Sequence, residues 1–191
     1  MADIIELNAT DLAAMLCSRV CHDLINPIGA IGNGLEVLDD PKQGEMAEGA
    51  RDLIASAAKQ SRAKLEFARL AYGASSTSGT DIDTRECERV AQILFDIEKA
   101  DLEWKAPLIL LPKHKAKLFM NMLLIAAGSV PRGGQVTASI TEPPANWSSS
   151  LTRSLRASAA DPAPGRRVDV ACLHGAAATA WSVFPHPGCS R

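Results

Sequence analysis

The sequence contains no run of about 18 consecutive apolar residues, so it predicts no membrane-spanning helix. It also lacks a block of lysine and arginine, which argues against nucleic acid as an obligatory partner. Its first residues, MADIIELNATDL, carry acids where a secretion signal would carry basic residues ahead of an apolar segment. These absences favour a cytoplasmic protein without membrane or nucleic-acid partners.

The cysteines do not follow the spacing of a disulfide framework. There are five, an odd number, which fits reduced thiols. Cys17, Cys21 and His22 form a CxxxCH run, whereas c-type haem attachment requires CxxCH. On a helix the two thiols lie four residues apart beside apolar neighbours, so we expect them to be small buried hydrophobic residues.

What is present is enough for one or two soluble domains. The chain has 191 residues, 47% of them hydrophobic, and a formal net charge of −2, which is typical of a globular protein with a core. Apolar spacing predicts a helix from Asn8 or Thr10 to about Leu38 and a second helix from about Glu45 to Tyr72. A hairpin of two helices, over residues 1–73, leaves part of its apolar surface exposed. We therefore expect a second copy to complete a four-helix bundle.

A second domain is expected after the sequence GASSTSGT, whose small polar residues have the composition of a linker. The pattern then predicts a helix from Asp83, a short strand over 102–104, a helix from Pro112 to Gly128 and a strand over 135–141. This order is typical of a small α/β sandwich over residues 81–144. Together with the hairpin it makes the chain an α+β protein.

The last stretch, residues 145–191, has a different composition. Alanine, serine, arginine, proline and glycine make up 29 of its 47 residues, which leaves little for a regular apolar pattern. One interpretation is a disordered tail; the other, which the abrupt change favours, is a frame-shifted translation of a GC-rich gene. Under either interpretation His174, His186 and Cys189 do not form a metal site.

One histidine, His22, lies in the helix-periodic stretch RVCHDLINPIGAIGNGLEVL. At about 100° per residue, the apolar residues of this helix gather on one stripe, which consists of Leu12, Leu16, Val20, Leu24, Ile28, Ile31, Leu35 and Leu38. His22 projects away from this stripe, and Asn26, Gly29 and Asn33 project close to His22. Pro27 removes a helical hydrogen bond, so it is predicted to bend the helix just beyond the ring.

The chemistry open to His22 is nucleophilic. A neutral imidazole has one ring nitrogen with a free lone pair, which can attack phosphorus and form a phosphoramidate. Asp23 can accept a hydrogen bond from the other ring nitrogen, and Asn26 can orient the incoming phosphoryl group. Helix geometry alone leaves open that His22 is a surface residue of a dimerisation scaffold that has no chemistry.

The run SRVCHDLINPIGAIGNGLEVL resembles the phosphoacceptor helix of ChpT-type bacterial histidine phosphotransferases, and more distantly the His-acid-x-x-x-Pro box of sensor histidine kinases. In this resemblance His22 is the phosphoacceptor, Asp23 its acidic neighbour and Pro27 the box proline. The similarity continues through the second helix and KLFMNMLLIAAGSVPRGG, over residues 8–141. It implies a dimeric four-helix bundle followed by a degenerate, Bergerat-type ATPase-like domain, with phosphotransferase activity.

The same resemblance implies the partners. The phosphoryl donor would be the receiver domain of a CckA-like hybrid histidine kinase, and the acceptors would be CtrA-like and CpdR-like response regulators of the cell cycle. If a receiver docks over the His22 face, Arg19, Asn26, Gly29 and Asn33 are the expected contacts, because a glycine lets a partner backbone approach closely. The chain itself is expected to bind no cofactor or metal, with Mg²⁺ on the receiver.

The sequence also departs from the nucleotide site of kinases. Asn121 falls where the kinase N-box would begin, but Ile125 follows four residues later, and neither a DxGxG segment nor a glycine-rich lid appears. ATP binding and autokinase activity are therefore not expected. The alternative is an ATP-dependent kinase core truncated or frame-shifted after Thr141. The domain is expected to be incomplete at its C-terminus in either case, without further strands after Thr141.

Overall fold

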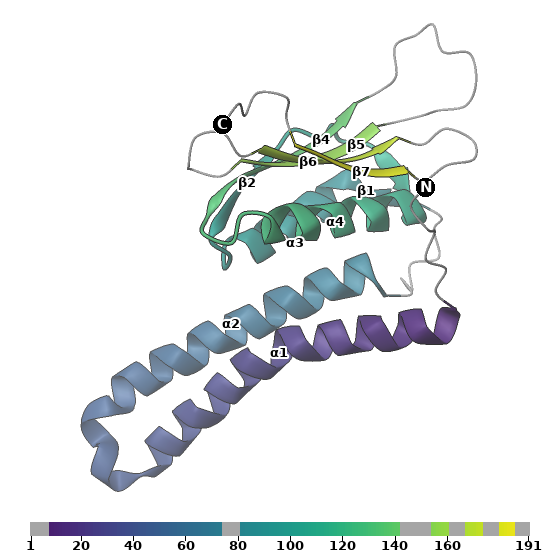
Figure 1. Ribbon diagram of the computed structural model, residues 1–191. Coiled ribbons are helices and arrows are strands. Elements are labelled where there is room, and N and C mark those ends of the chain that lie inside the picture. The colour runs from purple at the N-terminus through teal and green to yellow at the C-terminus, as the bar shows by residue number, and fades with distance from the viewer. Residues whose placement is uncertain (1–7, 74–80, 142–153, 161–166, 174–179, 186–191) are drawn as a thin grey trace, which may run out of the picture. The chain divides into compact units, whose positions relative to one another are not determined.

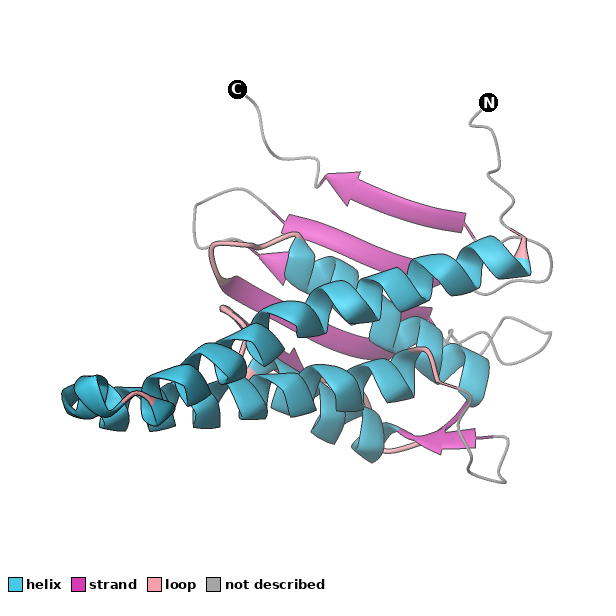
Figure 2. Ribbon diagram, turned by 90° about the horizontal axis from the view of Figure 1, so that it is seen from below, coloured by secondary structure: helices cyan, strands magenta, loops and turns pink. Residues whose placement is uncertain are grey.

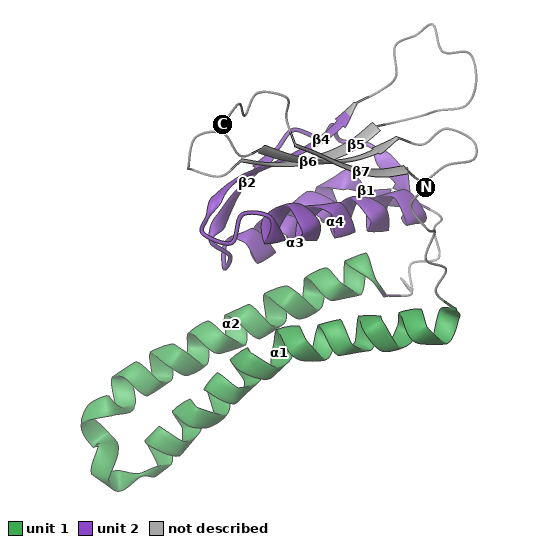
Figure 3. Ribbon diagram, viewed as in Figure 1, with its two compact units in different colours: residues 1–72 green, residues 73–191 purple. Residues whose placement is uncertain are grey.

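The computed structural model of the chain describes residues 8–73, 81–141, 154–160, 167–173 and 180–185. The chain divides into two compact units, Met1–Tyr72 and Gly73–Arg191 (Figure 3). No helix in the described ranges combines the length and apolar character needed to cross a membrane.

The first unit is a hairpin of two long helices (Figure 1). Helix α1 spans Ala9–Asp39, and the side chain of Asn8 caps it by accepting a hydrogen bond from the Asp11 N–H at 2.9 Å. Helix α2 spans Ala47–Ala71. The 3₁₀ helix η1, Pro41–Met46, connects the two, so the second helix begins later than the sequence predicts.

Helix α1 bends, as predicted. Figure 1 shows it changing direction along its length, and Pro27 lies inside it, where the Asp23 carbonyl has no N–H donor in the next turn. Gly34 lies beside α2, and a Cβ atom on it would be 2.6 Å from Cγ1 of Ile54. Glycine at this position therefore allows the close approach of the two helices.

Much of the apolar surface of the hairpin remains exposed, because α2 covers only one side of α1. Over residues 8–72, the exposed large apolar residues are Leu12, Met15, Ile25, Ile28, Leu35, Met46, Leu53 and Leu65. Cys17 and Cys21 are exposed as well, so the expectation of buried thiols is wrong for a single chain.

The second unit contains a five-stranded sheet, formed by β2 (Ala100–Trp104), β4 (Gly134–Thr141), β5 (Ser154–Ala160), β6 (Arg167–Leu173) and β7 (Ala180–Pro185). The strands lie in the order β2-β4-β5-β6-β7; β2 and β4 are parallel and the other pairs antiparallel (Figure 2). Helices α3 (Thr84–Phe95) and α4 (Lys113–Gly128) lie on one side of this sheet (Figure 1).

The core of this unit lies between the helices and the sheet. It contains large buried side chains, among them Phe119, Met120 and Leu123 of α4, and alternate residues of β4 from Val136 to Ile140 are buried. The ring of Trp104 packs edge-to-face on Phe119 with 5.4 Å between centroids.

Two short strands that the sequence analysis missed form a second sheet. Strand β1 (Asp81–Asp83) pairs antiparallel with β3 (Leu110–Pro112). The buried Thr84 holds this region together, because its hydroxyl donates to the Pro107 carbonyl at 2.8 Å and accepts from the Ile109 N–H at 2.9 Å. Strands of three residues are too short to show alternation in the sequence.

The expectation that no strand follows Thr141 is wrong. Strands β5, β6 and β7 lie within residues 145–191 and extend the sheet by antiparallel pairing. The overall composition of this stretch did not indicate the strands, because a strand needs only six or seven alternating residues. The segment RVDVACL provides such an alternation within a stretch rich in alanine and serine. The frame-shift interpretation of this stretch stays a prediction.

Candidate functional site

His22 lies on the middle part of α1 and points into solvent. Its side chain is 80% exposed, and Nδ1 lies 3.3 Å from Oδ1 of Asp23. A carboxylate can only accept a hydrogen bond, so in this contact Nδ1 is the donor. The Nε2 lone pair is then left on the outer side of the ring.

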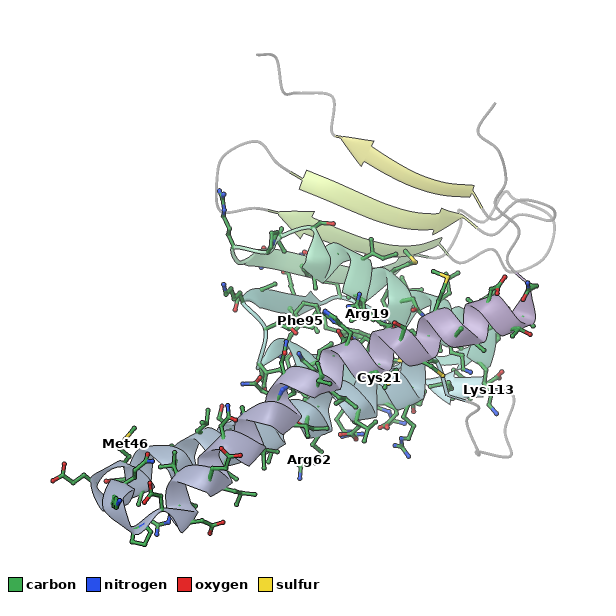
Figure 4. All side chains as sticks on the ribbon, turned by 60° about the horizontal axis from the view of Figure 1, so that its bottom comes forward. Arg19, Cys21, Met46, Arg62, Phe95 and Lys113 are labelled. Carbon is green, nitrogen blue, oxygen red and sulfur yellow. The ribbon has the colours of Figure 1, made fainter. Side chains whose placement is uncertain are left out.

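Asp23 is held from a second side by Arg19, one turn earlier on α1. The Arg19 Nε–H donates to Oδ2 of Asp23 at 2.8 Å, while Oδ1 faces the ring of His22. The side chain of Asp23 is 31% exposed, which is much less than that of His22. The structure thus places Arg19, predicted as a partner contact, on the carboxylate that orients the histidine (Figure 4 labels Arg19).

Tyr72 at the end of α2 belongs to the same neighbourhood, and the sequence analysis did not identify it. Burial raises the pKa of the Tyr72 phenol. Two smaller effects act on the same pKa: the positive charge of Arg19 lowers it, and the negative charge of Asp23 raises it. The end of α2 therefore borders the Arg19–Asp23 pair. An antiparallel hairpin brings the end of the second helix back to the first, and this is the signal that could have found Tyr72.

The residues predicted beside His22 lie on α1 as expected and form an open surface. Asn26, Gly29 and Asn33 are all exposed. A Cβ atom on Gly29 would have no other atom within 4 Å, so the surface is flat there. Within the described ranges, neither amide side chain has a recorded hydrogen-bond partner, which leaves their polar groups facing solvent.

The described part of the chain holds no cluster of three or more histidine, cysteine or acidic side chains that could bind a metal ion. His174, His186 and Cys189 lie outside the described residues. On α4, the side chain of Asn121 donates to the Lys117 carbonyl of its own helix at 2.8 Å, and Ile125 is exposed.

Comparison with known proteins assigns the family. The family described as histidine phosphotransferase C-terminal domain matches residues 84–178. A solved bacterial phosphotransferase is 41% identical to the chain, with a TM-score of 0.71, and the alignment covers 83% of this chain and 71% of that protein. The chain belongs to the histidine phosphotransferase family.

Within that family the similarity points to the ChpT type. The protein phosphotransferase ChpT of Brucella abortus (strain 2308) is 48% identical over 132 residues, which are 69% of this chain. The match spans 62% of the length of that relative.

Proposed function

We propose that this chain relays phosphoryl groups between the aspartates of receiver domains through a phosphohistidine at His22. The observation that carries this proposal is the geometry of His22, an almost fully exposed ring whose Nδ1 lies beside a carboxylate fixed by Arg19. That arrangement presents Nε2 as a nucleophile to a large partner. A buried histidine could not be reached by the aspartyl phosphate of another protein.

The proposed transfer uses side chains of the two proteins and the Mg²⁺ ion that the receiver domain would hold. The Nε2 lone pair attacks the phosphorus of the receiver's aspartyl phosphate, a bond forms between Nε2 and phosphorus, and the bond from phosphorus to the carboxylate oxygen breaks. The receiver's carboxylate leaves, and Nδ1 keeps its proton. The ring then carries a positive charge, which the Asp23 carboxylate stabilises. Transfer to the next receiver is the reverse of these steps.

Charge neutralisation on the phosphoryl group is assigned to Mg²⁺ held by the receiver domain. The exposed Asn26, Gly29 and Asn33 form the surface on which the receiver docks. By similarity to the ChpT type, the donor is the receiver of a CckA-like hybrid kinase and the acceptors are CtrA-like and CpdR-like regulators in the cytoplasm. The second unit is proposed to be a degenerate ATPase-like domain.

The proposed active form is a homodimer. Cys17, Cys21, Ile25, Ile28 and Leu35 are all exposed and follow one another at steps of four, four, three and seven residues, so they lie along one side of α1. We define these five residues as the α1 stripe. His22 projects about 100° away from Cys21 and about 60° away from Ile25 around the helix, so the ring lies beside the α1 stripe rather than on it.

The test is transfer of labelled phosphoryl groups. A receiver domain of a CckA-like kinase, phosphorylated with ³²P and freed of nucleotide, is mixed with the chain. We expect label on the chain that is labile in acid and absent from His22→Ala. His114→Ala, which removes another exposed histidine, is the matched control and retains the label. Label on His22→Ala, or none on the wild-type chain, would contradict the proposal.

A second incubation separates the relay from a kinase. The chain is mixed with labelled ATP in the absence of any receiver. We expect no label, whereas acid-labile label on His22 would show that the chain is an autokinase.

A further inference from the structure

The closed end of the hairpin contains a groove that plays no part in the proposed phosphotransfer. It has a volume of about 370 Å³, and we call it the tip groove; it is lined chiefly by Gly34, Val37, Glu45, Met46, Gly49 and Leu53. Met46 and Leu53 are 60% and 44% exposed, so their apolar side chains face solvent (Figure 4 labels Met46 at this end). His22 is twelve residues from Gly34 along α1, about 18 Å at the rise of an α-helix.

Two glycines shape the tip groove in different ways. Gly34 lies where α1 meets α2, and its missing Cβ lets the helices approach. At Gly49 an added Cβ atom would have no neighbour within 4 Å, so the missing side chain leaves open space. Met46, Gly49 and Leu53 follow at steps of three and four residues, which places them in one row along the groove.

A row of carboxylates runs beside this apolar row. Glu45, Glu48 and Asp52 each directly precede one of the three groove residues, so they lie along the neighbouring side of the helix. All three are exposed, and none has a recorded ion pair with another described residue. Between residues 36 and 53 the sequence has six acids and two basic residues. The tip groove is therefore an apolar surface with a negative border, which repels nucleic acid and anionic lipid.

The tip groove is separate from the α1 stripe. Leu35 belongs to the stripe and Val37 to the groove, and two residues correspond to about 200° around the helix. The two residues therefore lie on nearly opposite sides of α1. A second copy on the α1 stripe leaves the groove open.

We propose that the tip groove is a docking site for an amphipathic, positively charged helical segment of a partner protein. Apolar residues of such a segment, spaced over about two turns, would cover Met46 and Leu53 and insert one side chain into the space at Gly49. Lysine or arginine residues beside them would face Glu45, Glu48 and Asp52. His22 itself lies about 18 Å from the groove along α1, so the bound segment does not cover the imidazole.

The probe is a synthetic helical peptide with leucines at positions i, i+3, i+4 and i+7 and lysines on the neighbouring side. Its binding to the full chain is measured by calorimetry and by shifts of the amide resonances of Met46, Gly49 and Leu53. We expect Gly49→Leu, which fills the groove, to weaken binding at least tenfold. Ala55→Leu adds the same side chain elsewhere on the exposed surface of α2 and leaves binding unchanged.

Two further measurements decide the partner's chemistry. A peptide with glutamate in place of lysine should bind at least tenfold more weakly, and added salt should reduce that difference. Equal binding of the two peptides, no binding of the lysine peptide, or binding insensitive to Gly49→Leu would overturn the proposal.

The oligomeric state in solution tests the competing occupant, which is a second copy of the chain. If Gly49→Leu lowers the mass in sedimentation, the groove holds a second copy of the chain and the proposal is wrong. Phosphotransfer through His22 should be unchanged in Gly49→Leu, so failure of this inference and failure of the proposed function can be told apart.

Discussion

The second unit buries large side chains such as Phe119, Met120 and Leu123, whereas the described part of the hairpin, residues 8–72, buries only small residues and one proline apart from Phe67. In the second unit the apolar residues of helix and sheet cover one another within a single chain. In the hairpin many apolar residues remain in solvent, and the exposed His22 lies on the same helix as several of them. This contrast fits the proposal that the hairpin binds other proteins, because exposed apolar patches mark interaction surfaces.

The largest change in stability is expected from a substitution that creates a cavity in the core of the second unit. Phe119→Ala removes a fully buried ring that packs on Trp104 and should lower the free energy of unfolding of this unit by about 3–5 kcal/mol. Urea denaturation followed by tryptophan fluorescence measures this change, because all three tryptophans of the chain belong to this unit; far-UV circular dichroism follows the hairpin, which has no tryptophan. Leu65→Ala on the exposed surface of the hairpin is the control, expected within about 0.5 kcal/mol of wild type. Similar losses in both variants would contradict the contrast between the units.

The second prediction concerns the exposed apolar residues of the hairpin and the affinity of the proposed dimer. Ile28→Asp places a charge on the α1 stripe, and burying it against a second copy should weaken the dimer on the order of 100-fold, about 2.7 kcal/mol. Sedimentation equilibrium measures the mass, and Ala55→Asp, outside the stripe, should behave as wild type. An unchanged dimer in Ile28→Asp would show that the stripe is not the contact.

A smaller effect is expected within the site itself. Asp23→Asn keeps the shape of the side chain but removes the charge that stabilises the ring after transfer, so the rate of label transfer should fall about 10- to 100-fold. Single-turnover kinetics with a labelled receiver measures the rate. Dimerisation and unfolding of the hairpin should not change. A wild-type rate in this variant would show that Asp23 has no part in the transfer.

The smallest effect concerns the thiols. Burial raises the pKa of Cys87 from 9.0 to about 12, so the folded second unit keeps this thiol neutral while the unfolded chain ionises. Stability is therefore retained below pH 9 and decreases as the pH rises from 9 toward 12, by up to about 1.4 kcal/mol per pH unit. Urea unfolding at pH 8, 9 and 10 should show a smaller decrease in Cys87→Ala than in wild type. Cys17→Ala, which alters an exposed thiol of the hairpin, should keep the wild-type decrease.

The sequence predicted the long elements well because their periodicity extends over many turns. The helices of the hairpin and α3 and α4 lie within a few residues of their expected positions, and Asn8, one of the two predicted caps, is the observed cap of α1. Strands β1 and β3 are too short to show a period. Strands β5 to β7 lie in a stretch whose overall composition resembles that of a disordered segment, although short parts of it alternate between apolar and polar residues.

The site was predicted in part for a similar reason. His22, Asp23, Asn26 and Gly29 are neighbours on one helix, so helical geometry alone places them together. Tyr72 comes from the far end of α2 and approaches Arg19 and Asp23 only through the folding of the hairpin. The tip groove depends on a missing side chain at Gly49, which no periodicity in apolar residues can show.

The close approach at Gly34 has a consequence for how the hairpin can move. Sliding α1 along α2 by one turn would bring Ala30 or Leu38 to the place of Gly34, where a Cβ atom meets Ile54 and the Ala50 carbonyl. This steric contact therefore opposes sliding of one helix along the other and fixes their register. The position of His22 along the hairpin relative to the end of α2 is therefore fixed, and under the proposed function each receiver domain would meet the imidazole at the same distance from Tyr72.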